Sequence, residues 1–143
     1  MRRASISISK DVFDAMIEHC KEGLPNEACG FLAGKDGHAD RIYPLINQAA
    51  SPVFYKPDGK QMIAAMNDID DTGSDLIAIF HSHVASAPLP SPTDVREAHY
   101  PDAVYLIVSL KDLGSIEAKG FFIEKKDWRD AEGEVLEVAL VIS

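Results

Sequence analysis

The most constraining feature of the sequence is the continuous apolar run LIAIF at residues 76–80, which is followed at once by His81, Ser82 and His83. A run without polar alternation is typical of a strand that is buried on both faces in the centre of a sheet. Polar residues at its C-terminal end mark a place where such a strand delivers side chains to a site. Because residues two apart in a strand face the same side, we expect His81 and His83 to lie side by side and Ser82 to point away.

The segment after this strand supplies a carboxylate. Ser91, Pro92 and Asp94 match the N-cap, first and third positions of a short helix that we expect to reach about His99. Asp94 is then a candidate third ligand beside the two histidines. Two imidazoles and a carboxylate suit zinc, and three protein ligands leave one tetrahedral position for water, as in catalytic zinc sites. A further carboxylate from elsewhere in the chain is needed to take and return a proton.

Each part of this constellation also has a purely structural interpretation. Paired histidines at a strand end are often solvated or lie at the edge of a core, and Ser-Pro-Thr-Asp is a good capping box by itself. Glu27, which follows Pro25 and Asn26, fits a solvated turn equally well. The conjunction of all these residues at fixed offsets favours the metal site.

The pattern His-x-His, seven residues, Ser, two residues, Asp, with a glutamate upstream in NEACGFLAG, resembles that of the JAMM (MPN+) metalloproteases. The resemblance extends from about the first helix to YLIVSL. It includes the segments NEACGFLAG, SPVFY and HSHVASAPLPSPTD, which look like those of small stand-alone bacterial members. One type of these removes cysteine from the C-terminus of a sulfur-carrier protein.

This resemblance implies a role for each residue of the pattern. His81, His83 and Asp94 would bind Zn²⁺, Glu27 would act as general acid and base, and Ser91 would help to hold the oxyanion. The implied reaction is hydrolysis of an amide bond near the C-terminus of a small ubiquitin-like or sulfur-carrier protein, by Glu-assisted attack of zinc-bound water. The implied fold is of the JAB/MPN type, which is related to cytidine deaminases.

The periodicity along the chain predicts a single α/β domain over residues 1–143, with helices packed on a central sheet, and the resemblance implies that this sheet is mixed and mostly antiparallel. Helices are expected after the caps Ser9, Asp58 and Ser91, the first of them ending at Gly23. Pro44 places the strand ADRIYPLIN at a sheet edge. Met62, Ile63, Ala65, Met66 and Ile69 are expected to share the buried face of the second helix. Strands are expected at SISIS, NEACGFLAG, ADRIYPLIN, LIAIFHSH, AVYLIVSL, SIEAKGFFIE and EVLEVALVIS.

Charge and cysteine content exclude several classes of function. The chain has 14 Lys and Arg against 23 Asp and Glu, a net charge of −9, which argues against nucleic acid or an anionic membrane as partner. The N-terminal stretch lacks the apolar run of a signal peptide, and no stretch suits a membrane span, so we expect a cytoplasmic protein. Cys20 and Cys29 are expected to be free and buried, although Cys29 is close enough in sequence to Glu27 for a nucleophile to be conceivable.

Several questions stay open at this stage. A non-catalytic MPN scaffold or protein-interaction module is the main alternative to an enzyme, and metal analysis separates the two. A DNA-repair-associated branch with a similar motif is disfavoured by the acidic charge, and a nucleobase deaminase would need a P-C-x-x-C that the chain lacks. The substrate is not readable, and apolar strand edges favour a homodimer. His19, His38 and His99 are assigned surface or core roles.

Overall fold

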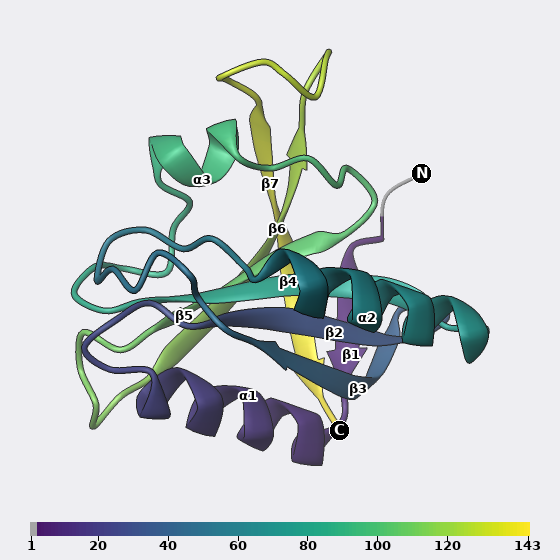
Figure 1. Ribbon diagram of the computed structural model, residues 1–143, viewed down its shortest axis with the longest axis horizontal. Coiled ribbons are helices and arrows are strands. Elements are labelled where there is room, and N and C mark those ends of the chain that lie inside the picture. Colours follow the sequence, from purple (N-terminus) through teal and green to yellow (C-terminus); the bar gives the residue numbers. More distant parts are fainter. Residues whose placement is uncertain (1–2) are drawn as a thin grey trace.

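Seven strands and three helices follow one another along residues 3–143, the part of the chain that the computed structural model describes (Figure 1). Met1 and Arg2, at the start of the stretch interpreted as lacking a signal peptide, lie outside the described residues. The elements are β1 (Ser5–Ile8), α1 (Lys10–Glu22), β2 (Cys29–Lys35), β3 (His38–Leu45), α2 (Gly59–Asp71), β4 (Asp75–His83), α3 (Pro92–Arg96), β5 (Val104–Ser109), β6 (Glu117–Glu124) and β7 (Glu134–Ile142).

The sheet closes into a barrel with the strand order β1-β3-β2-β4-β5-β6-β7. Strand β1 pairs in parallel with β7, which runs beside it in Figure 1, and also with β3. The pair β4–β5 is parallel as well, whereas β2–β3, β2–β4, β5–β6 and β6–β7 are antiparallel. The expected mixed sheet with helices is therefore present. The prediction is corrected in one respect, because the sheet is closed into a barrel. The pairing of β1 with β7 occupies edges that an open sheet would leave free, and the homodimer argued from free edges stays a prediction.

Strand β4 lies between β2 and β5 and is buried on both faces, which explains its unbroken apolar sequence. Phe80 belongs to a core cluster that also includes Met16 and Cys20 of α1. Ile79 belongs to a second cluster, with Ala65 and Ile69 of α2. Since side chains alternate along a strand, His81 follows Ile79 on the face toward α2, and the site is built at the end of a rigid, doubly packed strand.

Most of the expected elements are present, with local differences. Ser9 lies at the N-cap position of α1, but its side chain makes no capping hydrogen bond within the described residues. Gly23 ends this helix, and Asp58 caps α2 through the Gln61 N–H. Ile63 is 65% exposed, so its place on the buried face of α2 was wrongly predicted. Helix α3 ends at Arg96, earlier than expected.

Pro44 lies in the part of β3 beyond its short pairing with β1, where β3 is paired with β2. Its position agrees with the edge character expected from a residue that has no N–H to donate.

Among residues 3–143, no helix is both long and apolar enough to cross a membrane.

Candidate metal centre

Three side chains converge at the C-terminal end of β4. His83 Nε2 lies 3.0 Å from Asp94 Oδ2 and 3.1 Å from His81 Nε2. The third side of the triangle, His81 Nε2 to Asp94 Oδ2, is 3.2 Å. His81 is 1% and His83 5% exposed, so the three atoms meet in a buried place. The structure therefore brings together the three residues that the sequence predicts as ligands.

Asp94 reaches the histidines because α3 begins with a reciprocal capping box. Ser91 Oγ accepts a hydrogen bond from the Asp94 N–H at 3.0 Å, and the Ser91 N–H donates to Asp94 Oδ2 at 2.9 Å. Asp94 Oδ2, which accepts the hydrogen bond from the Ser91 N–H, is also the oxygen that faces both imidazoles. Capping and ligand placement are thus two results of one geometry, and the structural interpretation of Ser-Pro-Thr-Asp does not compete with the metal site.

The hydrogen bonding of His83 indicates that the centre favours a cation or a proton between its three polar atoms. Its Nδ1 lies 2.9 Å from the Ala87 carbonyl oxygen, which only accepts, so Nδ1 carries a hydrogen. In a neutral imidazole Nε2 then presents a lone pair toward the Asp94 carboxylate. Electron pairs that converge at 3.0–3.2 Å in a buried place repel one another unless a cation or a proton lies between them.

The protonation equilibria of these residues agree with this argument. Burial lowers the pKa of His83, but hydrogen bonds to Asp94 and Ala87 outweigh burial and raise it overall. Burial raises the pKa of Asp94, yet hydrogen bonds with His81 and His83 hold it well below its usual range. Burial dominates at His81 and lowers its pKa, which leaves that ring neutral. A carboxylate facing a neutral imidazole is a suitable pair of ligands for a divalent ion.

The spacing of the donor atoms fits zinc. A tetrahedral zinc ion with bonds of about 2.0–2.1 Å holds its ligand atoms about 3.3–3.4 Å apart. The separations of 3.0, 3.1 and 3.2 Å found here are slightly shorter, and the donors are two imidazole nitrogens and a carboxylate oxygen. The chemistry and the spacing therefore both suit this metal.

The two imidazoles are held by different contacts. His83 has the Ala87 carbonyl as the acceptor that a metal-bound histidine usually has. His81 Nδ1 is buried without a hydrogen-bond partner among the described residues. Instead the His81 ring is stacked on Tyr55, with centroids 4.4 Å apart and an angle of 19° between planes. The sequence marks Tyr55 only as the end of the segment SPVFY, and its contact with His81 was not predicted, because it lies 26 residues upstream of His81, in a loop.

Glu27 is placed beside the centre just before β2. It is 7% exposed, and burial raises its pKa to about 7, with His83 lowering it and Asp94 raising it through their charges. Its N–H donates to the Ser51 carbonyl at 2.8 Å, and its own carbonyl accepts from Asn47 Nδ2 at 2.9 Å. The backbone that carries the carboxyl is thus fixed on both sides.

Ser82 points away from the histidines, as expected, and has a supporting contact. Its Oγ accepts a hydrogen bond from the Ala28 N–H at 2.8 Å. This bond ties the residue next to Glu27 directly to β4, between the two histidines. The position of Glu27 relative to the ligands is therefore set by the sheet.

The remaining candidate residues lie outside the centre. Cys20 and Cys29 are free and buried, as expected, and burial raises the pKa of each thiol to about 12, which argues against a nucleophile. The other three histidines have structural contacts: His19 with the Cys29 carbonyl, His38 with Ser7 Oγ, and His99 with the Trp128 ring.

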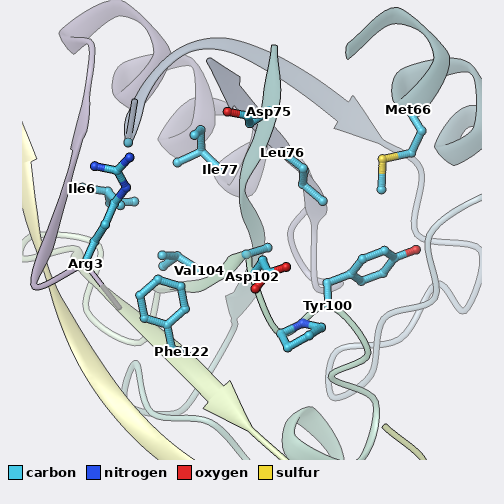
Figure 2. Close-up of a pocket in the computed structure, with 13 residues that line it drawn as sticks. Arg3, Ile6, Met66, Asp75, Leu76, Ile77, Tyr100, Asp102, Val104 and Phe122 are labelled. Atoms are coloured by element: carbon cyan, nitrogen blue, oxygen red, sulfur yellow. The ribbon is translucent and has the colours of Figure 1, made fainter. Parts of the chain in front are cut away.

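Two cavities frame β4. One of about 560 Å³ lies at its N-terminal end, where Figure 2 shows walls formed by Leu76, Ile77 and Tyr100. Another of about 490 Å³ is lined by Ile79 of β4 and by Tyr55, the residue that is stacked on His81.

Comparison with known proteins gives one consistent family. The profile of a family described as prokaryotic homologs of the JAB domain matches residues 9–122. The chain is 36% identical over 118 residues to the CysO-cysteine peptidase of Mycobacterium tuberculosis, which covers 81% of each protein. It is 37% identical over 117 residues to the desampylase of Haloferax volcanii, covering 76% of this chain and 84% of that protein. A solved structure from Desulfitobacterium hafniense, 34% identical, has a TM-score of 0.84 and covers 96% of this chain and 92% of that one.

Proposed function

The chain belongs to the prokaryotic homologues of the JAB domain, and from this membership we propose that it is a zinc metallopeptidase. The proposed reaction is hydrolysis of an amide bond near the C-terminus of a small ubiquitin-like or sulfur-carrier protein, one form of which releases a C-terminal cysteine. The observation that carries the proposal is the buried convergence of His81 Nε2, His83 Nε2 and Asp94 Oδ2 within 3.0–3.2 Å of one another. These three residues would hold the ion.

A bound zinc ion supplies a Lewis acid for the scissile carbonyl and makes water more acidic. The protein must still position a base beside that water. Glu27 suits this role because its buried carboxyl has a pKa of about 7 and interacts with the charges of His83 and Asp94. As a carboxylate it takes the proton of the attacking water, and as a carboxylic acid it returns that proton to the departing amine.

Ser91 is assigned to the scissile carbonyl. Its Oγ accepts the capping hydrogen bond from the Asp94 N–H, which engages the oxygen and not the hydroxyl hydrogen. That hydrogen is donated to the carbonyl oxygen of the substrate as negative charge develops there. The same residue thereby orients a ligand and stabilises the oxyanion.

The substrate class is proposed from the relatives. One is named a CysO-cysteine peptidase and another a desampylase, and the chain covers most of both proteins. We place the reaction in the cytoplasm, where two free, buried thiols are usual. The alternative of a non-catalytic scaffold would not require a complete ligand set.

The proposal is tested with carrier proteins that bear C-terminal extensions after Gly-Gly. Zinc-loaded protein is incubated with each carrier, and loss of the extension is followed by mass spectrometry with and without a chelator. We expect chelator-sensitive loss in the wild type and none in Glu27→Gln, with about one zinc per chain in both. Loss of one cysteine identifies the sulfur-carrier form. A wild-type chain that binds no zinc, or that cleaves no carrier, contradicts the proposal and favours the scaffold.

A further inference from the structure

The metal centre has an asymmetry that the ligand set alone does not explain. Ligating histidines are normally oriented by an acceptor for the second ring nitrogen, and loss of such a partner commonly weakens metal binding about 10–100-fold. His83 has this partner in the Ala87 carbonyl. His81, which is 1% exposed, has none for Nδ1 among residues 3–143. Another contact must therefore fix the angle of the His81 ring.

Besides its tilted contact with the His83 ring, with centroids 5.0 Å apart, the His81 ring is stacked on the ring of Tyr55. The two rings are nearly parallel, at 19°, with their centroids 4.4 Å apart. Stacking at this distance restricts both the tilt and the rotation of an imidazole, because each movement separates the two π surfaces. We propose that Tyr55 is the positioning residue for His81, and that Asn47 holds Tyr55 in place and couples it to Glu27. This inference rests on the proposed metal centre.

Tyr55 can orient a ligand only if its own segment is fixed, and Asn47 provides this. Asn47 Nδ2 donates to the Phe54 carbonyl at 3.0 Å, and its Oδ1 accepts from the Lys56 N–H at 2.9 Å. The residues on both sides of Tyr55 are thus bonded to one side chain. A third bond, from the Gln48 N–H to the Lys56 carbonyl at 2.8 Å, closes the loop around them.

The same side chain also reaches the proposed base. Asn47 Nδ2 donates its second hydrogen to the Glu27 carbonyl at 2.9 Å, and Oδ1 accepts a further bond from the Ala49 N–H at 3.0 Å. A primary amide offers two donors and two acceptor positions, so all four are in use. One half-buried side chain therefore links the segment that supports His81 to the backbone that carries Glu27.

The arrangement makes separate predictions for the two residues. Tyr55→Leu removes the π surface while retaining an apolar side chain, and should weaken zinc binding about 10-fold. Tyr55→Phe retains the ring and should bind zinc within about twofold of the wild type. Asn47→Ala should weaken zinc binding in the same direction, and should lower turnover further because the Glu27 backbone loses a donor. If Asn47 acts through Tyr55, the effects of the two changes on zinc affinity are not additive.

The experiment measures zinc affinity by competition with a chromophoric chelator and records the visible absorption of the cobalt-substituted proteins, which reports ligand geometry. Tyr100→Leu is the matched control, because Tyr100 lines the same cavity as Tyr55. We expect weaker zinc binding and an altered cobalt spectrum in Tyr55→Leu, and wild-type values in Tyr55→Phe and Tyr100→Leu. Circular dichroism of the metal-free proteins checks folding, and Tyr55→Met replaces Tyr55→Leu should the latter not fold.

The outcomes separate this inference from the proposed function, because neither readout requires a substrate. Zinc binding that depends on the Tyr55 ring in a protein that cleaves no carrier supports the inference and contradicts the peptidase. Carrier cleavage with zinc affinity and cobalt spectrum unchanged in folded Tyr55→Leu overturns the inference and leaves the peptidase standing. An equal loss in Tyr55→Phe and Tyr55→Leu also overturns it, since the ring would then not be the cause.

Discussion

Replacing Glu27 by glutamine should stabilise the metal-free protein at pH 8 relative to the wild type and should have little effect at pH 5. Burial raises the pKa of this carboxyl from its ordinary value of 4.5 to about 7, with smaller opposing effects of His83 and Asp94. A carboxyl whose pKa is higher in the folded than in the unfolded chain stabilises the fold at low pH, and loses this contribution as the pH rises through about 7. Glutamine stays neutral, so the variant does not lose it.

The size of the effect follows from the two pKa values. The difference between 4.5 and about 7 corresponds to at most about 3.4 kcal/mol. Solvent at the mouth of the site screens the charge, so we expect about 1–2 kcal/mol. Urea denaturation of the wild type and of Glu27→Gln, each with chelator, gives the free energy of unfolding at pH 5 and pH 8. The same change at exposed Glu22 is the control. A stability difference that is equal at both pH values would refute the reasoning.

Three other substitutions test separate parts of the structure. Ser91→Ala should lower the free energy of unfolding by about 1 kcal/mol, because the Asp94 N–H loses its capping acceptor. It should also lower turnover about 100-fold or more. Ser91→Thr should restore both, as measured by denaturation and by carrier cleavage. Asp94→Ala should weaken zinc binding more than about 100-fold in chelator competition, whereas Thr93→Ala on the same turn should not. Gly30→Ala should destabilise the protein by about 1–3 kcal/mol, because an added Cβ would clash with the Phe80 ring; an unchanged thermal melt would contradict this packing.

The convergence of the three proposed ligands could be predicted from the sequence because its geometry is local. His81 and His83 share a face through the two-residue period of a strand, and Ser91 and Asp94 are joined by a capping box within four residues. The helices after Ser9 and Asp58 are predictable for the same reason.

The rest of the site depends on contacts between segments that are distant in the sequence. Nothing in the local pattern indicates that Asn47 bonds to Glu27, or that Tyr55 stacks on His81, because a loop has no period from which side-chain directions follow. Barrel closure is hidden likewise, since β1 pairs with β7 at the other end of the chain. Ile63 shows the converse error: helical spacing places an apolar residue near the buried face, but the packing of α2 leaves it exposed.

Zinc K-edge X-ray absorption on the zinc-loaded protein tests the central claim most directly, because it reports the atoms bound to the metal. The account predicts one zinc per chain, with a shell of nitrogen and oxygen ligands at about 2.0–2.1 Å that includes two imidazoles. In Asp94→Ala this shell should change while the imidazole signal persists. A sulfur shell at about 2.3 Å, or a protein that binds no zinc, would contradict the assignment of His81, His83 and Asp94 as the ligands.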